Sequence, residues 1–566
     1  MSQNIKSGML SFLRKENIVA PKDYNRWRIP PASIAIHLCI GSVYAWSVFN
    51  PPLTREFGVV ASSAGDWSLS SVVWIFSVAI VCLGLAAALG GKWLERVGPR
   101  YVGVVAATLW GGGFIIGSFG ISTHQLWLVY LGYGVFGGCG LGLGYVSPVS
   151  TLIRWFPDRR GMATGMAIMG FGGGAMIGAP LKQWLLSLYQ IAPDYLGAES
   201  TLQLITENGR RFVQTASGKI EVVIATAQQA EDFGGDAGAY IVGTGNTGAS
   251  ATFMTLGIIY FVVMICAAFQ YRVPAQGWMP KGWTPKPASQ GMITRDNVHI
   301  DQALRTPQFW LLWVVLCFNV TAGIGVIGVA KTMINEIFGS LVIVTTAFAG
   351  TYVLMISVFN MVGRFFWAST SDYIGRKNTY HCFFILGTIL YLSIPYFAGE
   401  GSMLALAGFY LATMAIFTMY GGGFATIPAY LADMFGTMHV GGIHGRLLTA
   451  WSTAGVLGPF AITYLRNVSK NNAISDLVAN IDPAAFVQKF GAPIDQLESL
   501  VAAKTVTIAR LMEIAPAGTS DPTSGLYNTT MYSMAGLLVI AFLANALIRP
   551  VAGHHNVEKT HPEAKT

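Results

Sequence analysis

The sequence predicts an all-α membrane protein with twelve transmembrane helices in two pseudo-symmetric six-helix halves. Of its 566 residues, 53% are hydrophobic and only 11% are charged, whereas soluble domains carry about 25% charged residues. Twelve apolar stretches are long enough to cross a hydrocarbon core about 30 Å thick. A loop motif and several glycines also recur in the second half of the chain at a nearly constant offset. Such internal repetition indicates two halves with the same helix order.

The apolar stretches are centred near residues 40, 79, 110, 136, 174, 261, 320, 355, 388, 413, 455 and 540. Lys and Arg concentrate in the connections that follow every second helix, and the other short connections hold few of them. Because basic loops stay in the cytoplasm, we expect cytoplasmic N and C termini in a bacterial-type inner membrane. This asymmetry accounts for the net charge of +8 without nucleic-acid binding.

The repeat and the polar connections predict the following division of the chain. Residues 1–28 form a cytoplasmic N-terminal segment without a cleavable signal peptide. The two six-helix halves span 29–271 and 308–549, joined by a cytoplasmic linker at 272–307, and 550–566 form a cytoplasmic tail. Each half carries an extracytoplasmic insertion between its fifth and sixth helices, at 190–249 and 467–528. Within them, 211–225 reads as a hairpin, and 494–514 has helical periodicity.

Composition and spacing argue against catalytic chemistry. The six cysteines lie in apolar runs without CxxC or zinc-type spacing, so we interpret them as small core residues. We find no nucleophile–base set, metal-binding motif or phosphate-binding loop. We therefore expect no enzymatic activity and no cofactor.

The recurring loop motif is Gly-Lys-Trp-Leu-Glu-Arg-Val-Gly-Pro-Arg at 91–100 and Ala-Ser-Thr-Ser-Asp-Tyr-Ile-Gly-Arg-Lys at 368–377. Two copies at matching places resemble the loop signature of the major facilitator superfamily. Acidic and basic side chains at helix ends can hold neighbouring helix termini together. We expect the charged residues of both copies to gate conformational change: Glu95, Arg96, Arg100, Asp372, Arg376 and Lys377.

Further motifs at 41–49, 154–165, 360–367, 420–430 and 443–455 narrow the resemblance. Together they resemble the oxalate/formate antiporter family, which is related to the monocarboxylate transporters. The resemblance covers nearly all of the helical chain but neither insertion. It implies a secondary carrier that moves a small organic anion by alternating access.

Arg364 is the main candidate for binding that anion. It lies eight residues before Asp372, which places it about 12 Å inside the bilayer at 1.5 Å per residue. A charge at that depth faces the protein interior or a wet cavity, and a guanidinium fork suits a carboxylate. The alternative is an Arg bound to backbone carbonyls or reaching back to the surface. The resemblance favours the site, because that family places its anion-binding Arg at the matching position.

Several residues are expected to line the site with Arg364. Asn360 lies one turn before it, where related proton-coupled carriers have an acid, and Asn cannot titrate. The resemblance places aromatic cage positions at His37 and Tyr44, and an aromatic wall at Tyr420 and Phe424. Ordinary helix packing is the alternative for these, and for Tyr145 packing and carboxylate binding are equally open. Proton coupling through His37 also stays open.

Helix eleven departs from the family. The oxalate-carrying members of the family have a second cation in this helix, and the aligned residue in this chain is Trp451. One buried cation balances one carboxylate, and a second carboxylate would stay unpaired in low dielectric. We therefore expect a monocarboxylate such as formate, pyruvate or lactate, with oxalate as a further candidate. Arg446 lies nearer the cytoplasmic entrance and is assigned to a loop or gate.

Two other functions stay open. The helically spaced Met162, Met166 and Met169 allow a carrier for a different substrate, including a metal ion, although such stripes usually serve packing. The insertions allow a transporter-like receptor that binds an anion and signals through partners. The expected partners are a small carboxylate, a proton or counter-anion, and the lipid bilayer, with the carrier acting as a monomer.

Overall fold

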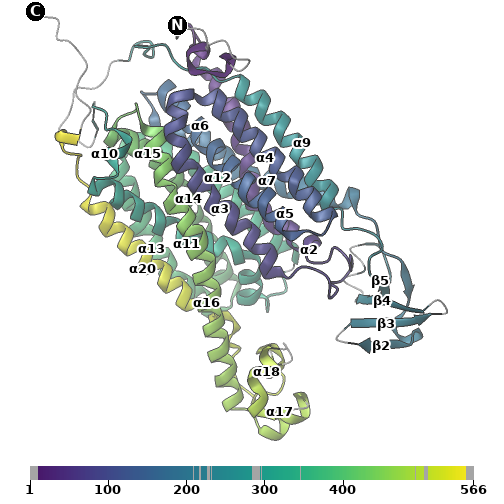
Figure 1. The fold of residues 1–566 in the computed structure, drawn as a ribbon. Coiled ribbons are helices and arrows are strands. Elements are labelled where there is room, and N and C mark those ends of the chain that lie inside the picture. The colour runs from purple at the N-terminus through teal and green to yellow at the C-terminus, as the bar shows by residue number, and fades with distance from the viewer. Residues whose placement is uncertain are drawn as a thin grey trace, which may run out of the picture.

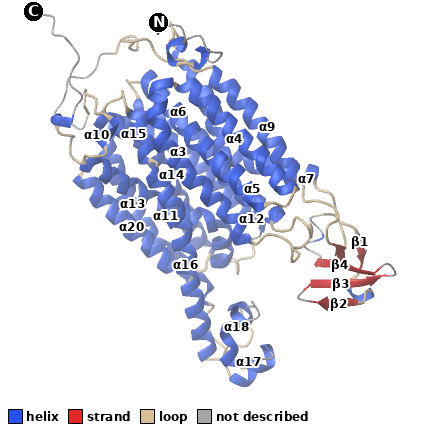
Figure 2. Cartoon of the chain, in the orientation of Figure 1, coloured by secondary structure: helices blue, strands red, loops and turns tan. Residues whose placement is uncertain are grey.

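The computed structural model describes residues 11–207, 210–215, 218–225, 230, 233–283, 293–294, 296–344, 346–490, 493–502, 506 and 508–555. They form one helical bundle with two additions at one end (Figures 1 and 2). We call the end that carries residues 91–100 and 368–377 the motif end, and the end from which the additions extend the insertion end. The described N-terminal segment and the residues after the last long helix lie at the motif end (Figure 1).

The first half of the bundle begins after three short 3-10 turns, η1 (Ser11–Leu13), η2 (Lys15–Ile18) and η3 (Arg26–Arg28). Its first helix is α1 (Ile29–Gly41), continued by the 3-10 helix η4 (Ser42–Phe49) and by α2 (Asn50–Leu53). Next come α3 (Leu69–Val97) and α4 (Pro99–Ser122). The fourth helix consists of α5 (Leu126–Val129), the π-helical segment η5 (Tyr130–Gly137) and α6 (Gly138–Trp155). The half ends with α7 (Arg160–Tyr189) and α9 (Ala249–Phe269).

The second half follows the short linker helix α10 (Ile300–Ala303). It contains α11 (Pro307–Phe338), α12 (Thr346–Ile374), α13 (Arg376–Glu400) and α14 (Met403–Phe435). Its fifth helix is divided into α15 (Val440–Leu447) and α16 (Thr449–Ala479), and its sixth is α20 (Asn528–Leu547). The 3-10 turn η9 (Gly553–His555) follows.

All twelve predicted centres fall within these helices. In the described part of the chain, eleven helices are long and apolar enough to cross a membrane. The remaining centre, near residue 455, lies in α16, which packs against α3 and α11 inside the bundle. The membrane part of α16 is less apolar because it carries Thr449, Ser452 and Thr453. The predicted α-helical membrane bundle is confirmed, and the twelfth helix is assigned by its packing.

Two glycines turn the chain sharply at the motif end. Gly98 separates α3 from α4 with φ of 92°, and Gly375 separates α12 from α13 with φ of 86°. An L side chain rarely adopts this backbone conformation. Both glycines belong to the repeated loop motif, so the motif sets the same turn in each half.

The first insertion folds into a five-stranded antiparallel sheet with strand order β1-β5-β4-β3-β2. The strands are β1 (Tyr195–Gly197), β2 (Leu204–Glu207), β3 (Arg210–Thr215), β4 (Gly218–Ala225) and β5 (Gly238–Ile241), with the 3-10 turn η6 (Glu199–Thr201). β3 and β4 pair antiparallel, which confirms the predicted hairpin; its turn residues 216–217 lie outside the described residues. Val60, from the loop between α2 and α3, packs against Val223 and Tyr240 and fixes the sheet to the first half.

The second insertion continues α16 beyond the bundle (Figure 2). It contains α17 (Pro483–Phe490), η7 (Ile494–Gln496), α18 (Leu497–Ala502), α19 (Ile508–Met512) and η8 (Pro522–Gly525). The helical periodicity of 494–514 corresponds to η7, α18 and α19, which turn apolar side chains to the local core; residues 503–505 and 507 lie outside the described residues.

All six cysteines are free. Cys39 and Cys317 are buried, as predicted, but Cys266 and Cys382 are exposed. Their helices, α9 and α13, turn apolar side chains outward. Lipid takes the place of water on that surface, so an apolar run does not distinguish the core from the lipid-facing side.

Candidate anion site between the two halves

Arg364 lies in α12 where this helix packs against α7 of the other half. Glycines in α7 make the close approach feasible. A Cβ atom on Gly165 would lie 3.0 Å from the backbone oxygen of Arg364, and one on Gly172 would lie 3.0 Å from its Nε. The side chain of Arg364 is fully buried. The predicted interior position therefore holds, and the guanidinium does not reach back to the surface.

The guanidinium is only partly satisfied by the protein. Its Nε donates to Oδ1 of Asn360 at 3.0 Å, and its Nη1 donates to the backbone oxygen of Ile168 at 3.2 Å. Nη2 is buried and has no hydrogen-bond partner among the described residues. No carboxylate in the described part of the chain forms an ion pair with it. Three of the five guanidinium N–H groups therefore have no assigned protein acceptor.

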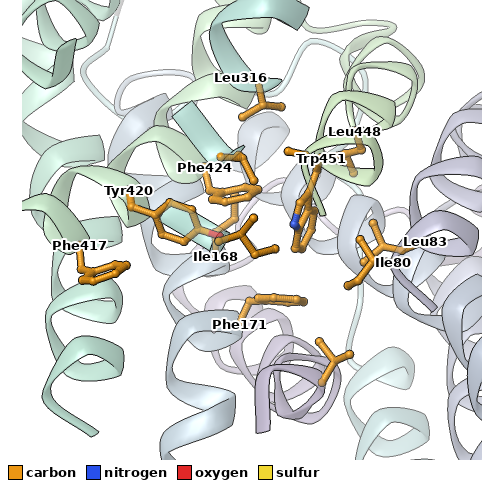
Figure 3. Close-up of a cluster of buried hydrophobic side chains, with 14 of the residues drawn as sticks. Ile80, Leu83, Ile168, Phe171, Leu316, Phe417, Tyr420, Phe424, Leu448 and Trp451 are labelled. Carbon is orange, nitrogen blue, oxygen red and sulfur yellow. The ribbon is translucent and has the colours of Figure 1, made fainter. Parts of the chain in front are cut away.

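Aromatic rings surround this cation. The guanidinium carbon lies 5.5 Å from the ring centre of Phe171 and 5.4 Å from that of Phe424. Phe424 lies 4.8 Å from Trp451, and Trp451 lies 5.3 Å from Phe171, each measured between ring centres. Figure 3 shows these rings with Tyr420 beside Phe424. Ring faces stabilise a cation without neutralising it, so the net positive charge of the site remains.

Four further donors around the rings lack partners. The hydroxyls of Tyr44, Tyr145 and Tyr420 and Nε1 of Trp451 are buried, and none has a hydrogen-bond partner among the described residues. The hydroxyl of Tyr44 lies close enough to Arg364, Tyr420 and Trp451 to interact with each of them. Burying an unsatisfied polar group costs about 1–3 kcal/mol. Several unsatisfied donors beside one unpaired cation provide what the oxygen atoms of an anion require.

The site thus joins all eight residues expected from the sequence to bind substrate. His37 contributes differently from the others, because its ring nitrogens face backbone oxygens of Ala167 and Tyr145. Two site residues were missed. Phe171 contacts the rings of His37, Tyr44, Tyr145 and Trp451, and it is the only aromatic residue in the glycine-rich stretch 170–174. His444, inside the motif 443–455, is fully buried 5.9 Å from the ring of Tyr145.

An acidic residue of one half caps a helix of the other at the motif end. The two carboxylate oxygens of Asp372 accept hydrogen bonds from the backbone N–H groups of Gly161 and Met162, each at 2.9 Å. These groups start α7, where a negative charge is favourable. Arg376 pairs with Asp372 at 2.6 Å and with Asp433 at 2.9 Å, so the contact between the halves is part of a charge network.

The first loop motif makes the matching contact. Glu95 pairs with Arg154 and lies against the backbone of Gly441 at the start of α15. Nearby, Asp301 of the linker pairs with Lys92 of the first half at 3.2 Å and with Arg446 of the second at 3.0 Å. The hydrogen bond from Lys92, with help from Arg446, lowers the pKa of Asp301 below its usual value. This places Arg446 in a contact between the halves at the motif end.

The other basic residues of the motifs serve different contacts. Arg100 donates to the backbone oxygens of Phe269 and Tyr271 at the end of α9. Lys377 donates to the backbone oxygens of Ala546 and Ile548 at the end of α20. Cations favour helix C-termini, so these residues fix the last helix of each half. Arg96 is exposed, and its gating role stays a prediction.

Small residues bring the halves into contact at the motif end. A Cβ atom on Gly445 would lie 2.0 Å from the backbone oxygen of Ala87, and one on Gly161 would lie 2.1 Å from that of Ala368. Both pairs join α7 or α3 of the first half to α12 or α15 of the second. The motif end is therefore closed in this structure, with Arg364 at the inner end of the closed seam.

Comparisons with known proteins agree with this architecture. The chain is 25% identical over 440 residues to the oxalate:formate antiporter of Oxalobacter formigenes, covering 77% of this chain and 83% of that protein. It is 22% identical over 465 residues to apicoplast pyruvate carrier 1 of Toxoplasma gondii, covering 73% and 78%. The solved structure of the E. coli fucose:proton symporter has a TM-score of 0.52 at 12% identity, covering 91% and 99%.

The resemblance drawn from the loop motifs is thereby confirmed. The sequence model of the Major Facilitator Superfamily matches residues 32–195 and 233–461, which is more than half of the chain. The gap in this match falls within the first insertion. The chain belongs to the major facilitator superfamily, and it is a multi-pass membrane transporter and not an enzyme.

Proposed function

We propose that this protein is a secondary active transporter of a small organic anion, with Arg364 as the anchor of the anion. The observation that carries the proposal is a fully buried guanidinium whose Nη2 has no hydrogen-bond partner among the described residues and no neutralising carboxylate. A charge in that position is costly unless a partner neutralises it. Two of its relatives, an oxalate:formate antiporter and a pyruvate carrier, support the same substrate class.

The charge balance of the site favours a monocarboxylate such as formate, pyruvate or lactate, with oxalate as a further candidate. Trp451 is fully buried against Phe171 and Phe424, and it brings an indole where a second cation would be needed for a second carboxylate. An unpaired carboxylate in low dielectric is strongly disfavoured.

The position of the site between the halves supports alternating access. The contacts through Asp372 and Glu95 close the motif end, and rocking of one half against the other would release them. We assign the motif end to the cytoplasm of a bacterial-type inner membrane, with both termini there. Two features support this assignment: basic residues concentrate in the motif-end loops, and the described terminal segments lie together at that end (Figure 1).

Counterflow in proteoliposomes tests the proposal. Vesicles loaded with unlabelled acid should accumulate labelled formate, pyruvate, lactate or oxalate transiently through the wild-type protein. Arg364→Ala should abolish this signal, whereas the control Arg305→Lys, at an exposed linker position, should retain it. Full counterflow by Arg364→Ala would reject the function as proposed. So would the absence of counterflow of all four acids by the wild-type protein.

A further inference from the structure

The two ring nitrogens of His37 both face backbone acceptors. Nδ1 lies 2.5 Å from the oxygen of Ala167 in α7, and Nε2 lies 3.3 Å from the oxygen of Tyr145 in α6. A neutral imidazole has one N–H group, so one of its nitrogens would turn a lone pair toward a carbonyl oxygen. Only an imidazolium donates to both oxygens. The fully buried surroundings of His37 are therefore arranged for the protonated ring.

A second buried histidine provides the contrast. His444 is also fully buried, and neither of its ring nitrogens has a hydrogen-bond partner among the described residues. The ring of Tyr145 lies between the two histidines, 5.2 Å from His37 and 5.9 Å from His444. A proton on His444 would leave two charged N–H groups unsatisfied in low dielectric, which is costly. Of the two histidines, only His37 has acceptors for a proton.

The charged group that opposes a proton on His37 is Arg364. From neighbouring elements, His37 faces Tyr145 of α6, Arg364 of α12 and, through Tyr145, His444 of α15. Of the other titratable groups near α1, Cys39 lies two residues further on, on another side of the helix, and the rest lie at least one turn away. The rest are Tyr44 on its own chain segment, Lys182 of α7 at the oxygens of Ser42 and Ala45, Tyr260 of α9 near Ser42, and Tyr271 near Ser33.

This arrangement links the proton to the anion. When the site is empty, the positive charge on Arg364 repels a proton on His37. An anion bound to the guanidinium cancels that repulsion, so the proton binds more readily, and by reciprocity the proton strengthens binding of the anion. An empty site and a site that holds one monocarboxylate and one proton have the same net charge.

We propose that His37 binds the coupling proton and that the carrier moves this proton together with the carboxylate held by Arg364. The proposal rests on the proposed function, because it needs an anion at that site. It gives the carrier a titratable group despite Asn360, which cannot take up a proton.

Calorimetry on the purified protein tests it directly. Pyruvate is titrated into the wild type in buffers that differ in ionisation enthalpy, which reports the protons taken up for each anion bound. Pyruvate itself stays fully ionised across neutral pH. We expect uptake of up to one proton per pyruvate, and an affinity for pyruvate that rises as pH falls, by at most about tenfold per pH unit. Binding of pyruvate without proton uptake would overturn the proposal.

Two variants locate the proton. His37→Gln should bind pyruvate with an affinity that does not change with pH and without proton uptake. His444→Gln, the matched buried control, should keep the proton uptake of the wild type. Loss of proton uptake in His444→Gln, or proton uptake that persists in His37→Gln, would contradict the assignment. If His37→Gln does not fold, the wild-type proton count still decides whether coupling exists. If the wild type binds none of pyruvate, formate, lactate and oxalate, the proposed function itself fails.

Discussion

Replacing Arg364 by lysine retains the charge and removes the guanidinium fork, so it isolates the contribution of geometry. Asn360 and the oxygen of Ile168 each accept one hydrogen bond from Arg364, which leaves three N–H groups for an anion. A carboxylate can therefore accept two hydrogen bonds from the remaining groups. An ammonium has three N–H groups, and the same two protein acceptors would leave it one. The Arg364→Lys variant thus loses one charge-assisted hydrogen bond to the anion.

Such a bond contributes about 1.5–3 kcal/mol, which corresponds to roughly 10- to 150-fold weaker binding. We expect this loss in the dissociation constant of pyruvate, measured by calorimetry on the purified protein, with Arg305→Lys as the control for a Lys-for-Arg change at an exposed site. Equal pyruvate affinities in Arg364→Lys and the wild type would refute the assignment of Arg364 as a fork-shaped anchor.

Three further results are expected. Trp451→Lys places a second cation in the buried site. In calorimetry it should raise the affinity for oxalate relative to pyruvate by at least about tenfold. An unchanged ratio of the two affinities would contradict the charge-balance argument. Gly445→Ala puts a Cβ atom 2.0 Å from the oxygen of Ala87 and should slow counterflow. Gly112→Ala has open space around the new Cβ atom and should not slow it. Equal counterflow rates in the two variants would argue against the closed seam. Asp372→Asn removes the charge at the start of α7 and the ion pair with Arg376. The first effect alone is a loss of about 0.3–1 kcal/mol, so hydrogen–deuterium exchange at the motif end should increase. Unchanged exchange would show that the cap does not hold the halves.

Much of the site followed from the chain itself because its residues are marked by local context. Arg364 stands out as a charge within an apolar helix, and periodicity alone places Asn360 one turn away on the same face. The positions of Tyr44, Tyr420 and Phe424 came from the family resemblance and not from periodicity. By contrast, Phe171 gives no signal of its own, because one aromatic residue in a glycine-rich helix is equally suited to packing against lipid.

Partners across the two halves could not be predicted in the same way. The carboxylate of Asp372 meets the start of α7 more than 200 positions earlier in the chain, and no local pattern specifies such a contact. His37 shows the same limit: its place in α1 was expected, but the two oxygens around its ring come from α6 and α7.

By itself, the sequence determined the helical membrane fold, the repeat of two halves and the buried cation, because hydrophobic length, helical period and charge act over neighbouring residues. Only the tertiary structure decided which donors stay unsatisfied around Arg364 and which helix starts are capped across the interface. The physical reason is close packing. Glycines such as Gly165 and Gly445 let helices from opposite halves approach within contact, and that approach selects which polar groups meet and which are left for a ligand.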